Sequence, residues 1–371
     1  MNILFVTEYY WPHLGGVELV FQKLAEGLAR KGHRVTVVTI KLKNTKKKEV
    51  INGVNISRVS VPSFANRYFF TFFSIGQVWN LAKKADIIHA TLYNAAFPTW
   101  IVSVLQKKKS VLTVHEVFGK RWTELFDTSY LFAKMHQCIE WIILLLPFHK
   151  YVCVSKSTLN DLKKYVEERK VETIYNGIDY ELFDSLKYDK EKSRKKIGLE
   201  NKFLYVYFGR PGISKGLEYL IKAVPIIQKK KPDAHLLLLL AKEPQSRYEK
   251  ILELIEKLQI KNMVTLKEPV ERKNLPSYIK AADCVVIPSL AEGFGFSAAE
   301  SSAMEAVTVV SDTSSLPEVV YGKVIFVEPK NVEAIANGVM KAHEGKYEMI
   351  PKKKMTWEEC IAKHEALYKN M

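Results

Sequence analysis

The sequence predicts an α/β protein made of two doubly wound parallel sheets, and three observations lead to this prediction. Short apolar segments, typical of strands buried on both faces, alternate with segments of helical period. The alternation occurs twice, once on each side of a charged stretch near residue 190. The length of 371 residues also exceeds what one hydrophobic core usually organises. We therefore expect two domains, at residues 1–185 and 200–350.

The first half begins with a strand, a helix and a second strand. The segment "NILFVTEYY" is a continuous apolar run, and "GVELVFQKLAEGLARKGH" after it has helical period and ends near Gly32. The segment "RVTVVTI" predicts another buried strand, so the three segments form a right-handed parallel unit. Further strands of this half are expected at "ADIIHAT", "KSVLTVHE" and "KYVCVSKS".

The second half repeats this organisation after residue 200. Its expected strands are "NKFLYVYFGR", "AHLLLLLA", "NMVTLKE", "CVVIPS" and "TVVSD", with mostly helical segments between them. The polar stretch "SLKYDKEKSRKKIGLEN" between the halves is interpreted as a surface linker. Residues 351–371 have helical period in "TWEECIAKHEALYKNM" and are expected to form a helix that packs back toward the first domain.

Composition limits the classes of protein that the chain can belong to. No segment reaches the roughly eighteen consecutive apolar residues that span a bilayer, and no basic region precedes the first apolar run, so no signal peptide is expected. The 4 cysteines lie far apart, with no C-x-x-C pair and no His cluster at metal-ligand spacing. We therefore expect buried thiols, a cytoplasmic location, and neither a metal nor a cofactor.

The positive charge of the chain is unevenly distributed. The net charge is +16, and residues 20–125 hold 18 Lys and Arg against 5 Asp and Glu, whereas residues 126–185 hold 7 against 9. An anionic membrane, a phosphorylated substrate or merely a solvated lysine-rich surface would fit this excess. Nucleic-acid binding is not expected, because the chain contains no recognisable nucleic-acid module.

Glycine-rich and polar loops follow strands of both halves, which is where open parallel sheets bind ligands. Gly15 and Gly16 lead into a helix whose N–H groups and dipole favour an anion, although a tight turn without a ligand fits equally well. In "YFGRPGISKG", Arg210 offers a planar fork and Lys215 a point charge, a combination suited to a diphosphate. His115 also follows a strand, where it either orients a polar ligand or is an ordinary hydrogen-bonded histidine.

Two glutamates, Glu292 and Glu300, stand on either side of a Gly-Phe-Gly turn in "AEGFGFSAAE". Ser297 and Glu300 have the S-x-x-E spacing of a capping box, which would bind Glu300 to the start of its own helix. Glu292 has no comparable local role and is expected to be exposed in the turn. The pair is therefore open to catalysis, to ligand hydrogen bonding or, for Glu300, to helix capping.

An aromatic segment, residues 64–79, lies within the basic third of the chain. Seven of its sixteen residues are aromatic, and aromatic and basic groups together suit the headgroup region of an anionic bilayer. The alternative is a buried aromatic helix pair that lines the domain. The residues of the expected membrane or acceptor patch are Phe64, Arg67, Tyr68, Phe69, Phe70, Phe72 and Phe73.

Taken in order, these motifs resemble family 4 of the retaining glycosyltransferases (glycosyl transferases group 1), which have the GT-B fold. The resemblance covers nearly the whole chain and consists of "GGVE", "TVHE", "YNGID", "GRPGISKG", the E-x7-E motif "EGFGFSAAE" and "LPEVV". It implies two Rossmann-like domains facing a central cleft, with the acceptor on the first domain and a nucleotide-sugar on the second.

The resemblance further implies a hexosyltransferase-type reaction without a metal, since the chain also lacks a D-x-D motif. The implied acceptor is a glycan or lipid-linked glycan of cell-surface glycan or glycolipid biosynthesis. The implied location is cytoplasmic and peripheral, on the inner face of the cell membrane.

Specific residues receive roles from the same resemblance. Arg210 and Lys215 would hold the diphosphate and stabilise the charge that develops on the leaving phosphate. Glu300 would accept hydrogen bonds from the ribose hydroxyls, Glu292 would accept them from the donor sugar, and His115 would face that sugar. The loop residues implied in donor binding, chiefly through backbone N–H groups, are Gly15, Gly16, Gly295, Phe296 and Ser297.

Three positions depart from the family pattern. Glu305 stands where members usually have glycine, and Ser314 and Ser315 replace a glycine pair. Glu305 adds a carboxylate near the nucleotide and is expected to remove a turn with positive φ. These departures motivate an alternative, a catalytically weak GT-B subunit that binds nucleotide or membrane within a glycan-assembly complex.

Overall fold

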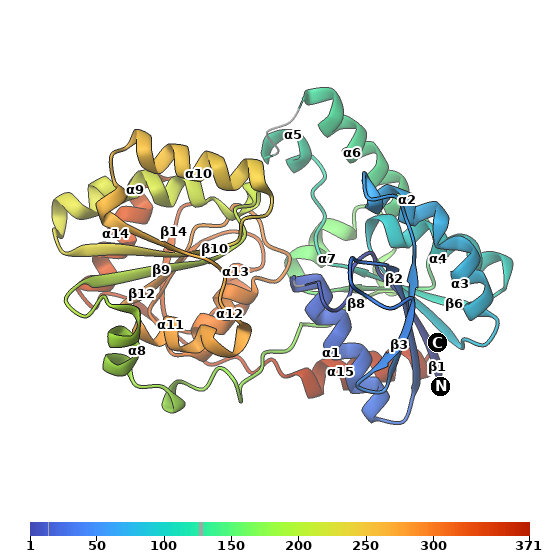
Figure 1. Cartoon of the computed structure of the whole chain (residues 1–371). Coiled ribbons are helices and arrows are strands. Elements are labelled where there is room, and N and C mark those ends of the chain that lie inside the picture. Colours follow the sequence, from blue (N-terminus) through green and yellow to red (C-terminus); the bar gives the residue numbers. More distant parts are fainter. Residues whose placement is uncertain (14, 126–128) are drawn as a thin grey trace. The chain divides into compact units, whose positions relative to one another are not determined.

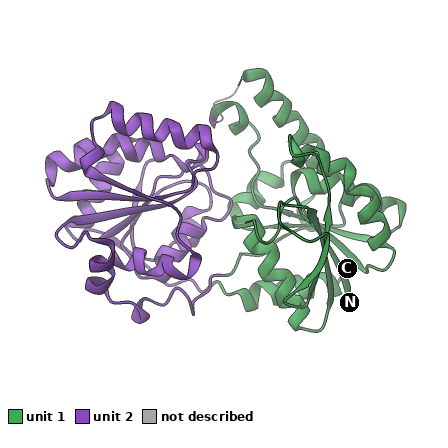
Figure 2. Ribbon diagram, viewed as in Figure 1, with its two compact units in different colours: residues 1–124, 128–177, 355–371 green, residues 125–127, 178–354 purple. Residues whose placement is uncertain are grey.

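The computed structural model describes residues 1–13, 15–125 and 129–371 and divides into two compact units (Figure 1, Figure 2). Among the described residues, unit 1 contains 1–13, 15–124, 129–177 and 355–371, and unit 2 contains Leu125 and 178–354. Each unit has a mainly parallel sheet with flanking helices. The predicted α/β class with two doubly wound sheets is therefore confirmed.

The sheet of unit 1 is parallel except at one edge. Its described strands are β1 (Asn2–Val6), β2 (Arg34–Ile40), β3 (Lys48–Ile51), β4 (Val54–Val59), β5 (Ile87–Thr91), β6 (Lys109–Val114), β7 (Lys150–Cys153) and β8 (Val171–Thr173). They are ordered β3-β4-β2-β1-β5-β6-β7-β8, and only the pairing of β3 with β4 is antiparallel. The chain changes direction across the sheet between β1 and β5, so loops that bind ligands are expected after these strands.

The helices of unit 1 include the C-terminal helix of the chain. They are α1 (Gly16–Arg30), α2 (Asn66–Phe73), α3 (Ile75–Ala82), α4 (Ala96–Leu105), α5 (Arg121–Leu125), α6 (Tyr130–Leu144), α7 (Lys156–Leu162) and α15 (Trp357–Lys369). Helix α15 lies directly against α1, because a Cβ atom at Gly27 would lie 2.1 Å from Ile361 Cδ1. The Tyr368 hydroxyl also lies 2.5 Å from His89 Nδ1 within the core.

Unit 2 has the same architecture. Its described strands are β9 (Phe203–Gly209), β10 (Ala234–Leu240), β11 (Val264–Lys267), β12 (Cys284–Ile287), β13 (Thr308–Ser311), β14 (Gly322–Val327) and β15 (Glu348–Ile350). Their order is β11-β10-β9-β12-β13-β14-β15, with β15 alone antiparallel to its neighbour. The helices are α8 (Lys190–Ile197), α9 (Leu217–Lys230), α10 (Gln245–Lys257), α11 (Leu275–Ala281), α12 (Phe296–Ala303), α13 (Leu316–Val319) and α14 (Val332–His343).

The stretch that was interpreted as a linker is instead part of unit 2. It forms α8, which begins at the N-cap Asp189 and ends at Gly198 in the left-handed conformation. Arg194 donates to the Ala281 carbonyl at 2.8 Å and contacts Asp283, while Lys190 lies 2.9 Å from the same carboxylate. The linker interpretation was wrong because the charged residues of this stretch pair with buried parts of the sheet rather than with water.

Two further expectations from composition meet the structure here. The thiols of Cys153, Cys284 and Cys360 are buried as predicted, but Cys138 is exposed on α6, so the expectation of four buried thiols was wrong. Among the described residues, no helix is both long and apolar enough to cross a membrane.

Candidate functional site

The loops after β9 and β12 meet at the carboxyl edge of the unit 2 sheet. These two strands are neighbours, and the direction of winding changes between them. The amides of Leu290 and Ala291 donate to the Ser214 carbonyl at 2.7 and 3.3 Å, which joins the two loops. The segment with Arg210 and Lys215 and the segment with Glu292 are thus held together at the position where a doubly wound sheet binds its ligand.

Lys215 and Glu292 form an ion pair within this loop pair. The Lys215 ammonium lies 2.8 Å from both carboxylate oxygens of Glu292, and the Ser289 hydroxyl donates to one of them at 2.9 Å. The Glu292 side chain is only 12% exposed. The expectation of an exposed Glu292 was therefore wrong, because donors from two different loops enclose its carboxylate.

The close approach of the two loops requires glycine at position 216. Gly216 has φ of +61°, and a Cβ atom there would lie 2.1 Å from the Pro288 carbonyl oxygen. Glycine alone combines this backbone conformation with the absence of a side chain. The neighbouring Arg210 is exposed, and its carbonyl accepts a hydrogen bond of 3.0 Å from the Tyr207 hydroxyl. Arg210 and Lys215 thus extend from a loop whose backbone is fixed on both sides.

Helix α12 begins directly after the Gly-Phe-Gly turn. Gly295 is its N-cap, with φ of +91°, and Phe296 and Ser297 are its first two residues. The predicted capping box was wrong, because Ser297 lies inside the helix and its hydroxyl points to the Phe208 carbonyl at 3.5 Å. The amide groups of the first turn therefore have no side-chain cap, an arrangement that favours an anion.

Glu300 is buried on α12 and is paired with an arginine that sequence reasoning missed. Its side chain is 3% exposed and contacts Arg272, from the 3₁₀ turn η6 (Arg272–Asn274) before α11. Burial raises the pKa of Glu300, the Arg272 guanidinium opposes this shift, and Asp179 adds to it. The guanidinium carbon of Arg272 also lies 5.2 Å from the Phe183 ring centroid. Arg272 gave no sequence signal because it comes from a different loop with no motif.

The three departures from the family pattern keep the backbone turns that glycine usually makes. Glu305 has φ of +56° and Ser314 φ of +51°, so the expectation that Glu305 removes a positive-φ turn was wrong. The Glu305 carboxylate accepts a hydrogen bond of 2.8 Å from the Ser185 hydroxyl. The buried Ser315 hydroxyl lies 2.9 Å from the carbonyl oxygens of both Glu292 and Phe294 and holds the glycine turn in place.

In unit 1, the predicted residues lie at the carboxyl edge of the other sheet. Gly15 is the extended N-cap of α1, and Gly16 is its first residue. His115 directly follows β6, and its Nε2 is buried without a hydrogen-bond partner among the described residues. Burial lowers the pKa of His115 to about 4, the Glu18 carboxylate partly opposing and His364 adding to this shift. His115 is therefore neutral near pH 7 and offers an imidazole nitrogen without a protein partner.

This burial predicts a pH dependence of stability. An unfolded histidine has a pKa of about 6.5, so between pH 6.5 and 4 the unfolded chain binds a proton that folded His115 does not. Stability is fully present above this window and falls as the pH is lowered through it, by up to about 1.4 kcal/mol per pH unit for one such group. His115→Asn is expected to reduce the slope in urea unfolding measured from pH 7 to 4. A slope identical to that of the wild type would contradict this account.

A polar cluster after β1 was not found from the sequence. The Glu8 carboxylate accepts hydrogen bonds from the Asn94 backbone and side chain at 3.1 and 3.0 Å, and Arg67 lies 3.7 Å away. Burial raises the pKa of Glu8, against the effect of Arg67. The rings of Tyr9 and His13 stack with centroids 4.3 Å apart. The loops after β1 and β5, at the change of winding, thus also bring together groups suited to a polar ligand.

The aromatic segment forms α2 and α3, and the predicted patch is only partly on the surface. Phe64, Arg67, Tyr68, Phe72 and Phe73 are exposed, and Phe69 is half-buried. Phe70 is fully buried in the core of unit 1, so its assignment to an exposed patch was wrong. The pair of helices is thus neither wholly buried nor wholly exposed.

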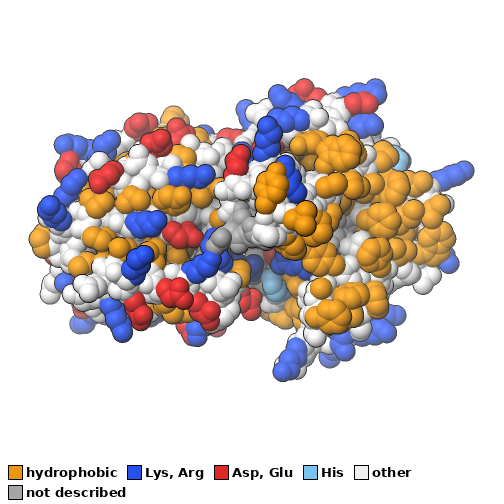
Figure 3. All heavy atoms as spheres, turned by 90° about the horizontal axis from the view of Figure 1, so that it is seen from above, with side chains coloured by type: hydrophobic (Ala, Val, Ile, Leu, Met, Phe, Trp, Pro, Cys, Tyr) orange, Lys and Arg blue, Asp and Glu red, His pale blue; other side chains and the backbone are white. Residues whose placement is uncertain are grey.

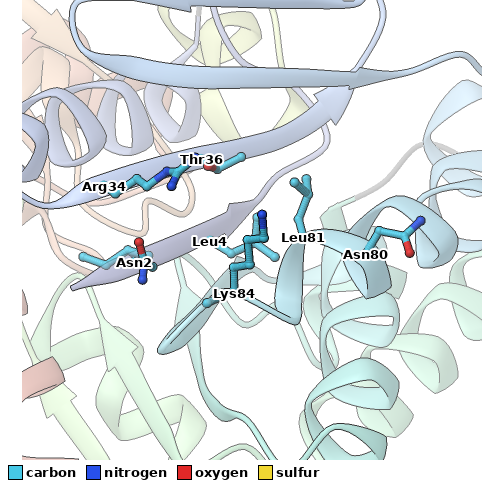
Figure 4. Close-up of a pocket in the computed structure, with 9 residues that line it drawn as sticks. Asn2, Leu4, Arg34, Thr36, Asn80, Leu81 and Lys84 are labelled. Carbon is cyan, nitrogen blue, oxygen red and sulfur yellow. The ribbon is translucent and has the colours of Figure 1, made fainter.

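A separate cavity of about 210 Å³ lies at the opposite edge of the unit 1 sheet (Figure 4). It is lined by Asn2 and Leu4 on β1, Arg34 and Thr36 on β2, and residues of α3 and the turn after it. These residues stand at the amino ends of the strands, away from the loops described above. No group of three or more His, Cys, Asp or Glu in the described part of the chain could hold a metal ion.

Both halves of the chain match family models. Residues 14–182 match the glycosyltransferase family 4 model, and residues 189–359 match the glycosyl transferases group 1 model. An uncharacterised glycosyltransferase of Methanocaldococcus jannaschii is 31% identical over 354 residues, which cover 91% of this chain and 88% of that protein. A phosphatidylinositol N-acetylglucosaminyltransferase protein of Homo sapiens is 23% identical and is covered to 68% by a match that spans 92% of this chain.

Among solved structures, HepE of Anabaena in complex with UDP and glucose superimposes with a TM-score of 0.80. The superposition covers 100% of both chains at 17% identity, which supports a common fold. The two sheets, the loops at their carboxyl edges and the match with the methanogen relative lead to one conclusion. The chain belongs to the family 4 glycosyltransferases and has the GT-B fold.

Proposed function

We propose that the chain moves a sugar, with retention of configuration, from a nucleoside diphosphate sugar to a lipid-linked or glycan acceptor. One observation carries the donor part of this proposal. The loops after β9 and β12 and the start of α12 bring Arg210, the Lys215–Glu292 pair and uncapped helix amides to one edge of the unit 2 sheet. Two cations and a helix N-terminus at such an edge suit a diphosphate.

Each side chain has a role in this proposal. As the glycosidic bond breaks, negative charge develops on the leaving phosphate, and the fixed cations Arg210 and Lys215 stabilise it more than they stabilise the bound donor. Glu292 orients the Lys215 ammonium and accepts hydrogen bonds from donor-sugar hydroxyls. Glu300, oriented by Arg272, accepts hydrogen bonds from the ribose. The neutral His115 contributes a hydrogen bond to the same sugar.

No protein carboxylate acts as a nucleophile in this proposal. The leaving phosphate takes the proton of the acceptor hydroxyl on the same face of the sugar, which accounts for retention without a metal. The Lys215 ammonium already holds the Glu292 carboxylate through both of its oxygens. This pairing favours a positioning role for Glu292 over attack on the sugar.

Names of relatives support the acceptor class. The human relative is named for transfer of N-acetylglucosamine to phosphatidylinositol, and HepE was solved with UDP and glucose. We extend these to a nucleotide-sugar donor and to an acceptor of cell-surface glycan or glycolipid biosynthesis. A cytoplasmic location, peripheral on the inner face of the cell membrane, is part of the same proposal.

The alternative is a catalytically weak subunit of a glycan-assembly complex. Glu305, Ser314 and Ser315 motivate it, but the left-handed backbone of Glu305 and Ser314 and the hydrogen bonding of Ser315 leave the turn of the donor site well formed. This geometry favours the active enzyme.

A panel of nucleoside diphosphate sugars tests donor binding. A donor present at about 100 times its Kd should stabilise the folded chain by about 2.7 kcal/mol, seen as a raised unfolding temperature. We expect this increase for the donor and for its nucleoside diphosphate, and not for the free sugar. If no nucleotide-sugar raised the unfolding temperature, the donor site proposed in unit 2 would be incorrect.

A further inference from the structure

Helix α6 of unit 1 has an apolar side with no partner among the described residues. Its inner side, which includes Ala133, Glu140, Ile143 and Leu144, is buried. On the opposite side, apolar residues recur every three or four positions, the spacing that places side chains on one face of a helix. These exposed residues are Leu131, Met135, Cys138, Ile142 and Leu145, and Leu131 is 80% exposed.

Helix α2 extends this apolar side. The Tyr68 hydroxyl lies 2.7 Å from His136 Nε2 on α6, so the two helices are in contact. Phe64, which is 70% exposed, Phe72 and Phe73 also reach the surface from this segment. Figure 3 shows hydrophobic side chains gathered over this side of unit 1. We define the α2–α6 face as Phe64, Tyr68, Phe72, Phe73, Leu131, Met135, Cys138, Trp141, Ile142 and Leu145.

The exposed charges of the two helices are all positive. Helices α2 and α6 contain the charged residues Arg67, Lys134 and Glu140. Glu140 is buried and accepts hydrogen bonds from the amides of Phe118 and Gly119. Arg67 and Lys134 are exposed, so a surface that is apolar at its centre carries cations and no exposed carboxylate of its own.

We propose that the α2–α6 face docks unit 1 onto a lipid bilayer that contains anionic lipids. Aliphatic and phenylalanine side chains would enter the acyl boundary, while Tyr68 and Trp141 would lie at the headgroup level, where such rings are enriched. Arg67, Lys134 and the net +13 of residues 20–125 would attract anionic headgroups.

A bilayer accounts for the charges of this face better than a second copy of the chain does. Two copies would bring cations of the same sign together across the contact, whereas anionic headgroups complement them. The inference rests on the proposed function in one respect, because a lipid-linked acceptor needs an enzyme at the membrane surface. Lipid binding itself involves neither donor nor acceptor.

Vesicle co-sedimentation at low salt tests the inference with the full chain and no nucleotide-sugar. We expect binding to vesicles of phosphatidylglycerol and phosphatidylcholine, and much weaker binding to phosphatidylcholine alone. The double variant Leu131→Glu and Ile142→Glu should bind the mixed vesicles at least roughly tenfold more weakly. The matched control is Leu186→Glu with Met349→Glu, since both side chains are exposed on unit 2. It should bind within about twofold of the wild type.

Cys138 provides a second measurement. It is the exposed cysteine among the four, so a polarity-sensitive maleimide dye can label it in the folded chain. The emission should shift to the blue when anionic vesicles are added. Equal vesicle binding by the face and control variants would overturn the proposal. So would a lipid-free dimer that only the face variant dissociates, combined with an unshifted dye. Because these measurements contain no donor, their failure is distinct from a failure of sugar transfer.

Discussion

Replacing Lys215 with alanine is expected to lower kcat/KM for sugar transfer by about 10²- to 10³-fold, the range seen when one group that stabilises transition-state charge is removed. The Lys215 ammonium stands at the carboxyl edge of the unit 2 sheet, fixed by two contacts of 2.8 Å to Glu292. The charge that it would meet grows as the sugar leaves the diphosphate, so the loss should fall mainly on kcat. Steady-state kinetics with the donor found in the binding panel measure this effect.

Lys242→Ala is the matched control for this variant. Lys242 is also a lysine of unit 2 and is paired with a glutamate, Glu268, but this pair is exposed. Its removal should leave turnover within about twofold, since exposed ion pairs contribute little. If Lys215→Ala and Lys242→Ala had the same kcat/KM, Lys215 would not belong to the site.

The substitution Gly216→Ala is expected to have the largest effect on stability, about 2–4 kcal/mol of unfolding free energy. Two costs add. Alanine is strained at φ of +61°, and its Cβ would lie 2.1 Å from the Pro288 carbonyl oxygen, which is backbone and cannot rotate away. The loops after β9 and β12 must then separate, so donor affinity should fall as well. Urea unfolding and donor titration measure the two effects.

Gly198→Ala separates strain from collision. Gly198 has φ of +79°, but a Cβ atom there would meet nothing within 4 Å. It should cost only the conformational term, about 1–2 kcal/mol, with donor affinity unchanged. Equal losses of stability for the two variants, with equal donor affinity, would show that the approach of the two loops is unimportant.

Much of the fold was predictable because buried parallel strands are continuous apolar runs. The segments "RVTVVTI" and "AHLLLLLA" correspond closely to β2 and β10. The hairpin of β3 and β4 was missed, although Asn52-Gly53 at its turn, with φ of +48° and +80°, is a recognisable hairpin signal. It was hidden by the lysine-rich segment before it. Helix α8 was missed because a charged helix that pairs with Asp283 has the composition of a linker.

The candidate site was predictable only as far as local motifs reach. Glycine-bracketed cations after a strand indicated Arg210 and Lys215, and the structure places them at the edge of the sheet. The partners of the two glutamates were not predictable, because Lys215 and Arg272 reach them from other loops. The capping-box pattern was misleading at Ser297, since Gly295 begins the helix and backbone geometry outweighs a four-residue spacing.

The turnover of a nucleoside diphosphate sugar tests the central claim most directly. The chain is incubated with the donor that raises its unfolding temperature, with and without a lipid-linked acceptor, and the products are followed by proton NMR. We predict release of the nucleoside diphosphate, faster with acceptor, and a new glycosidic bond with the anomeric configuration of the donor. Lys215→Ala should abolish both signals. Donor binding without any turnover, with or without acceptor, would contradict the account and favour the catalytically weak subunit.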